Sequence, residues 1–134
     1  MSTTKAVTKH KKSAPKKVSF LLLLVSDRLH GLKGKERERE DESGNTAARL
    51  IEEAGHKVLE REYVSNNRHH ISEAIIRPVV QKKAQVLLAI GGTGLSPRDV
   101  TVDTVRGLGM KEIEGFGEFF RQKSQKQIGT AAFL

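Results

Sequence analysis

Two stretches of the chain are apolar at nearly every position, and a third alternates in part. Residues 18–25 and 86–90 are runs of valine, leucine, isoleucine and other small or aromatic apolar residues, broken only at Ser19. An uninterrupted apolar run bounded by turn residues is typical of a strand buried on both faces of a sheet. Residues 57–64 alternate partly between apolar and polar and predict another strand. The pattern therefore predicts three strands, with 18–25 and 86–90 in the interior of the sheet.

The segments between these strands carry apolar residues at helical spacing. Helices are predicted at about residues 45–54, from about 68 onward, at 101–108 and at 112–128, the second interrupted by Pro78. Asp41 or Ser43 would cap the first of them, and Phe116, Phe119 and Phe120 would form the core face of the last. Residues 33–42 are charged or glycine at every position, so they are expected to be a mobile loop.

The order of these elements, with strands alternating with helices, predicts an α/β fold. It should be a three-layer sandwich around a mostly parallel sheet, with right-handed crossovers. In such a sheet the carboxyl ends of the strands lie at one edge. Asp27, Asn66 and Asp99 each follow the end of a predicted strand. They are therefore expected at the same edge, where open α/β sheets bind their ligands.

A glycine-rich turn follows the strand at 86–90 directly. It reads Gly91-Gly92-Thr93-Gly94-Leu95-Ser96-Pro97-Arg98-Asp99. Glycines allow positive φ and let backbone N–H groups approach an anion, so the turn suits a phosphate, with Asp99 as a carboxylate for a bridging Mg²⁺. It is neither a Walker A loop nor a dinucleotide fingerprint. A tight strand-to-helix turn without a ligand is the alternative.

Charge is concentrated at the amino terminus. The net charge is +8, but residues 1–17 contain six lysines and no acid, which leaves the rest of the chain nearly neutral. Residues 1–17 are therefore expected to form a disordered basic tail, with weak polyanion binding as a second possibility, and residues 18–134 one folded domain. The low aromatic content disfavours a nucleic-acid partner. The chain has no cysteine, no apolar run long enough for a membrane and no signal-peptide pattern, which favours the cytoplasm.

Several separate motifs together resemble one known family. They are Ser26-Asp27-Arg28, Asp41-x-Ser43-Gly44, the turn at residues 91–99, Glu114-Gly115-Phe116-Gly117-Glu118-x-x-Arg121 and Ile128-Gly129-Thr130-Ala131. In this order and spacing the chain resembles the MoaB/MogA family of molybdenum cofactor biosynthesis, which is related to the G domain of gephyrin. The resemblance runs from about residue 18 to residue 134.

The resemblance implies a domain that binds molybdopterin and transfers AMP to it from Mg-ATP. It implies a trimer or hexamer that passes its product to a MoeA-type molybdate-insertion protein. Asp99 would be catalytic and hold Mg²⁺, and position 66 would be the second catalytic residue. The residues implied to bind substrate are Ser26, Asp27, Ser43, Gly91, Gly92, Thr93, Gly94, Ser96, Gly115 and Glu118.

The chain departs from the family pattern in two places. Active members carry Pro-Asp after the second strand, whereas this chain has Ser65-Asn66. An amide oxygen coordinates a metal without charge, so either Asn66 is tolerated or the chain is a non-catalytic molybdopterin-binding or scaffold member. Family members also continue past the Gly129-Thr130-Ala131 motif with a strand, a phosphate loop and a helix. The folded domain is therefore expected to lack its carboxyl-terminal part.

Overall fold

The computed structural model describes residues 4–133, and its sheet is built around strand β1 (Ser19–Val25). β1 lies between β2 (Lys57–Val64) and β3 (Val86–Ile90), and both pairings are parallel. Leu21, Leu22 and Leu23 are at most 1% exposed. For this strand the prediction of burial on both faces is confirmed, because it has a neighbour on each edge and a helix over each face.

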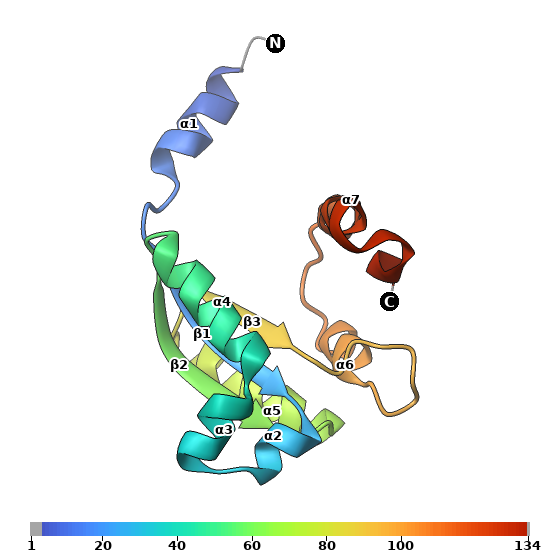
Figure 1. The fold of residues 1–134 in the computed structure, drawn as a ribbon. Coiled ribbons are helices and arrows are strands. Elements are labelled where there is room, and N and C mark those ends of the chain that lie inside the picture. Colours follow the sequence, from blue (N-terminus) through green and yellow to red (C-terminus); the bar gives the residue numbers. More distant parts are fainter. Residues whose placement is uncertain (1–3, 134) are drawn as a thin grey trace.

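Two helices complete the three layers. Helix α4 (Glu42–Glu53) covers one face of the sheet and helix α5 (Arg68–Val80) covers the other (Figure 1). The core on the α5 side joins Leu23 and Val25 of β1 to Ile71 and Ile75 of α5. Apolar burial of this kind provides most of the stability of such a domain. The predicted α/β three-layer sandwich with a parallel sheet is confirmed.

Strand β3 differs from the sequence prediction. It lies at the edge of the sheet, and Val86 and Leu88 are 36% and 38% exposed. Leu87 and Ala89 pack against the core on the α5 side. The other face of β3 is not covered because α4 packs over β1 and β2. The prediction that residues 86–90 are buried on both faces is therefore wrong.

The charged segment at residues 33–42 is helical and not the mobile loop that we expected. After helix α2 (Asp27–Gly31), helix α3 spans Gly34–Glu40. Arg28 pairs with Glu40 at 3.1 Å, and the guanidinium of Arg37 lies 4.7 Å from the ring centroid of Tyr63. Contacts of these long side chains with neighbouring elements hold the segment, although it has no apolar face.

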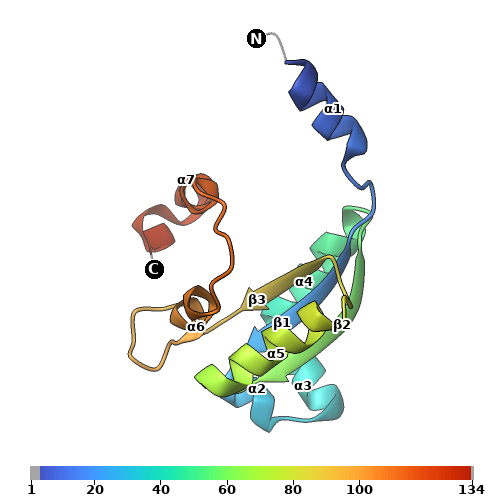
Figure 2. The ribbon, with the colours of Figure 1, turned by 180° about the vertical axis from the view of Figure 1, so that it is seen from behind.

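The basic amino-terminal segment contains helix α1 (Lys5–Ser13), where a disordered tail was expected. None of its residues is buried, and both views show it projecting away from the sheet (Figures 1 and 2). Lys11 and Lys12 lie in its last turn, where positive charges interact favourably with the helix dipole. Residues 1–3 of the expected tail lie outside the described residues.

Beyond β3 the chain forms α6 (Thr101–Gly107), α7 (Phe116–Ile128) and a 3₁₀ helix, η1 (Gly129–Phe133). Phe116, Phe119 and Phe120 are 64%, 56% and 63% exposed, so their prediction as a core face is wrong. α7 packs mainly on η1, and Figure 2 shows both standing apart from the sheet. Within residues 4–133, no helix has the length and apolar character required to cross a membrane.

Candidate functional site

The glycine turn after β3 is packed against the end of β1. Gly91 and Gly92 have φ values of +100° and +64°. A Cβ atom on Gly91 would lie 2.3 Å from the carbonyl oxygen of Val25, and one on Gly92 would lie 2.3 Å from Oγ1 of Thr101. The Thr101 hydroxyl donates to the Gly91 carbonyl at 2.8 Å. Only glycine fits either position, since both the dihedral angles and the space exclude a side chain.

Asp99 closes this turn on its far side. Its backbone N–H donates to the carbonyl of Ser96 at 2.9 Å, and its side chain folds back over Gly94. A Cβ atom on Gly94 would lie 2.7 Å from Oδ2 of Asp99. The carboxylate is thus held directly against the exposed glycine backbone. Gly94, Ser96 and Asp99 therefore form one compact unit.

The structure brings together the three strand ends that the sequence placed at one edge. The backbone N–H of Asn66 donates to Oδ1 of Asp27 at 2.9 Å, and its side-chain amide donates to the carbonyl of Arg98. Arg98 and Asp27 approach at 3.6 Å. This part of the prediction is confirmed: Asp27, Asn66 and the segment that carries Asp99 are in mutual contact.

The remaining predicted residues have different surroundings. Ser26 caps α2 by accepting from the N–H of Leu29 at 3.2 Å, next to Asp27, and Thr93 is exposed in the glycine turn. Ser43 is exposed in the first turn of α4. Gly115 and Glu118 are exposed at the start of α7, which Figure 1 shows apart from the end of β3. The structure therefore does not bring Gly115 and Glu118 to the glycine turn.

Asp41, at the start of α4, is a buried carboxylate with hydrogen-bond partners that the sequence did not predict. Asp41 is 0% exposed, and its Oδ1 accepts from the N–H of Gly44 at 2.8 Å, which confirms it as a helix cap. Its Oδ2 accepts from the Tyr63 hydroxyl at 2.8 Å and from Arg61 at 3.0 Å. Burial raises the pKa of the Tyr63 hydroxyl. The motif at residues 41–44 signalled the cap, but nothing local signalled the partners on β2.

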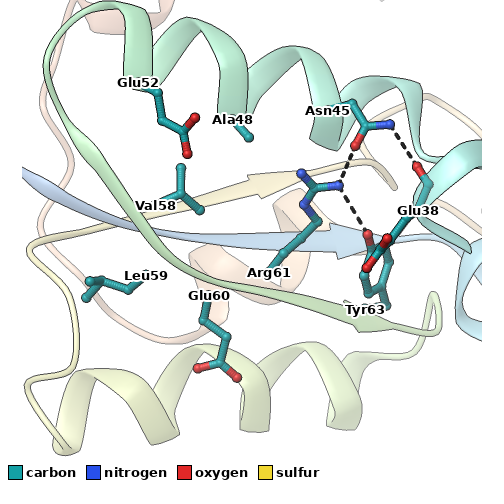
Figure 3. Close-up of a pocket in the computed structure, with 9 residues that line it drawn as sticks. All are labelled: Glu38, Asn45, Ala48, Glu52, Val58, Leu59, Glu60, Arg61 and Tyr63. Atoms are coloured by element: carbon teal, nitrogen blue, oxygen red, sulfur yellow. Dashed lines mark hydrogen bonds between the residues drawn. The ribbon is translucent and has the colours of Figure 1, made fainter. Parts of the chain in front are cut away.

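An open pocket of about 460 Å³ lies beside this cluster, between α4 and β2 (Figure 3). Arg61 is at its centre and donates to the side-chain oxygen of Asn45 at 2.8 Å. Glu38, Glu52 and Glu60 also line it. Since β2 and β3 are the opposite edges of the sheet, this pocket is separate from the glycine turn.

The protein groups near the glycine turn suit a magnesium ion only if a bound substrate supplies most of the other ligands. Among residues 4–133, no group of three or more histidines or acidic residues is arranged to hold a metal. Asp99 is a single half-buried carboxylate beside exposed backbone. Mg²⁺ commonly takes one or two protein carboxylates and completes its shell with water and substrate phosphates. The site therefore fits a magnesium ion that arrives with a phosphorylated substrate.

Fold and site together define a parallel α/β domain with a glycine-rich turn at the carboxyl edge of its sheet, the edge where open α/β sheets bind their ligands. Residues 21–134 match the family model described as "Probable molybdopterin binding domain". The chain belongs to this family, the MoaB/MogA proteins. It is 40% identical over 130 residues to molybdenum cofactor biosynthesis protein B of Bacillus cereus, covering 96% of this chain and 73% of the relative.

A second relative, named molybdopterin adenylyltransferase, comes from Pyrococcus furiosus. It is 36% identical over 128 residues, covering 96% of this chain and 71% of that protein. The fold matches a crystal structure of a molybdenum cofactor biosynthesis protein B at TM-score 0.76 and 38% identity, covering 91% and 72% of the two chains. It also matches the tungsten cofactor synthesizing protein MoaB of P. furiosus at TM-score 0.72 and 30% identity, covering 90% and 71%.

Proposed function

We propose that this protein acts in molybdenum cofactor biosynthesis by transferring AMP from ATP to molybdopterin. The relatives named above support the reaction, and one observation in this chain carries it. The Asp99 carboxylate lies against Gly94, in a turn whose glycines cannot be replaced without a clash. This arrangement supports the proposal, because a polyphosphate binds to backbone N–H donors and to a cation held by an acid.

In this mechanism the exposed backbone of the glycine turn binds the phosphates of ATP. An oxygen of molybdopterin bonds to the α-phosphorus, the bond between the α- and β-phosphates breaks, and pyrophosphate leaves. Asp99 is the residue that would hold a Mg²⁺ ion bound to ATP, and the ion would supply positive charge beside the phosphates. Ser26 and Asp27 line the pterin side, and Ser43 contributes from α4. The developing negative charge is thus met by fixed donors and not by reorganising water.

The proposal extends to the assembly. The exposed phenylalanines of α7 and the open edge of β3 leave apolar surface that a homo-oligomer would cover. We infer a trimer or hexamer, in which Gly115 and Glu118 complete a site together with another copy. The adenylylated product would then pass to a MoeA-type molybdate-insertion protein. Light scattering of the purified protein measures the assembly, and a monomer at micromolar concentration would exclude it.

The test of the reaction uses purified protein, Mg-ATP and molybdopterin, with adenylylated product separated by chromatography. The change Asp99→Asn should reduce product formation by about a hundredfold or more, because it removes the charge that holds Mg²⁺. Its melting temperature should change little, since Asp99 is half-buried at the surface of the turn. Equal loss of stability and activity would instead make Asp99 a structural residue.

One observation favours a second function. Asn66 stands where active members carry an acid, so this site has one negative charge fewer for binding a metal. A member that binds molybdopterin without transferring AMP would not need that charge. Isothermal titration separates the two functions. Molybdopterin binding with no product formation by the unaltered protein would support the binding or scaffold role.

A further inference from the structure

Both polar atoms of the Asn66 side-chain amide make hydrogen bonds. Its Nδ2 donates to the carbonyl of Arg98, and its Oδ1 accepts from the N–H of Val100 at 3.5 Å. Its backbone N–H donates to Asp27 at 2.9 Å. The same Oδ1 lies 3.0 Å from the position that a Cβ of Gly92 would occupy. Asn66 therefore touches the residues before and after Asp99 as well as the glycine turn.

These contacts demand one donor and one acceptor at the end of a short side chain. An amide supplies both, whereas an ionised carboxylate supplies only acceptors. An aspartate here would place a negative oxygen against the Arg98 carbonyl. It would also lie close to the carboxylate of Asp27, which accepts from the backbone of the same residue. The neighbouring positive charge, on the Arg98 guanidinium, is 3.6 Å from Asp27 and is highly exposed.

We propose that Asn66 is a positioning residue, which fixes the segment at 98–100 so that Asp99 stays against the glycine turn. In this chain Asn66 stands in place of the second catalytic acid of the family and acts as a clasp, meaning that its hydrogen bonds hold this segment in place. Asp99 is then the acid proposed to hold the metal ion. The role of Asp99 in this statement rests on the proposed function. The clasp itself rests on the hydrogen bonds of Asn66.

The test compares two identical substitutions at neighbouring residues. Asn66→Asp removes the donor to Arg98 while keeping size and shape. Asn67→Asp is the matched control, because Oδ1 of Asn67 accepts only, from the N–H groups of His69 and His70 at the start of α5. Asparagine and aspartate cap helices about equally well, and a negative charge favours this end of the helix dipole.

We expect Asn66→Asp to lower the melting temperature by roughly 4–8 °C and Asn67→Asp to leave it unchanged or raise it. Hydrogen exchange should accelerate in peptides spanning residues 91–100 of Asn66→Asp, and not in peptides from β1. Product formation should fall by roughly ten- to hundredfold, because Asp99 is misplaced. The Mg²⁺ concentration for half-maximal activity should rise, which a loss of stability alone would not cause.

A gain in activity for Asn66→Asp, with unchanged melting temperature and hydrogen exchange, would overturn the proposal. Position 66 would then be a catalytic position that works better with an acid than with an amide. Equal behaviour of the two variants would also overturn it. If the unaltered protein forms no product, the proposed function fails, while melting temperature and hydrogen exchange still decide whether Asn66 is the clasp.

Discussion

Asp41 combines complete burial with hydrogen bonds from Gly44, Tyr63 and Arg61. Removing the carboxylate would leave the charge of Arg61 without its partner. It would also leave the N–H of Gly44 and the hydroxyl of Tyr63 without an acceptor. We expect Asp41→Ala to lower the free energy of unfolding by about 2–4 kcal/mol, measured by urea denaturation. Glu53→Gln is the control, because its partner Arg49 is exposed and the pair should contribute about 0.5 kcal/mol or less. A similar small effect for both would mean that solvent reaches Asp41.

Tyr63 makes part of this stability depend on pH. Burial, the largest cause, raises its pKa above the ordinary value of 10.0. The unfolded chain therefore loses the phenolic proton at lower pH than the folded chain does. The contribution of this group is complete below pH 10 and is lost as pH rises through the folded pKa. Chemical denaturation between pH 8 and pH 12 should show this decline, and Tyr63→Phe should flatten it.

At this scale the sequence predicts residues whose position follows from strand ends. Asp27, Asn66 and Asp99 could be placed together because parallel strands end at one edge. The structure joins Asn66 to Asp27 and to Arg98, the residue before Asp99. The pairing of Asp41 with Arg61 could not be predicted, since it depends on how α4 packs over β2. The hydrogen-bond partners of the Asn66 side chain could not be predicted either. They are the carbonyl of Arg98 and the N–H of Val100, more than thirty residues away in the sequence.

At the scale of elements, α7 presents apolar side chains that the core does not use. Phe119→Ala should change the free energy of unfolding by less than about 1 kcal/mol, because the side chain is 56% exposed, with Nζ of Lys123 5.1 Å from the ring centroid. Ile71→Ala, at 0% exposed on α5, should cost about 2–5 kcal/mol. Urea denaturation of the dilute protein measures both. A large loss for Phe119→Ala would show that another copy covers α7.

The errors at this scale have a common physical origin. Apolar spacing identified 86–90 as a strand and 116–120 as one side of a helix, and both elements exist. Periodicity says which residues avoid water but not which surface covers them. In residues 33–42 the opposite holds, since a helix without an apolar face forms there through ion pairs and an arginine packed on Tyr63.

At the scale of the molecule, the fold begins at Val18, whose N–H donates to His56 and whose carbonyl accepts from Lys57. Deleting residues 1–17 should therefore leave the melting temperature within about 1 °C of the intact protein, because α1 buries nothing. Binding to heparin and its dependence on salt should disappear with the six lysines. Loss of molybdopterin binding in the same variant would mean that the domain starts earlier.

The central place of β1 has a consequence during synthesis on the ribosome. β1 is the first strand to leave the exit tunnel, yet its hydrogen-bonding neighbours are made later, β2 next and β3 last. At about 5–20 residues per second, its leucine run stays without a partner for seconds. Such a run pairs readily with other nascent chains. The folding yield in the cell should therefore depend on chaperones that hold residues 19–25 until β2 and β3 arrive.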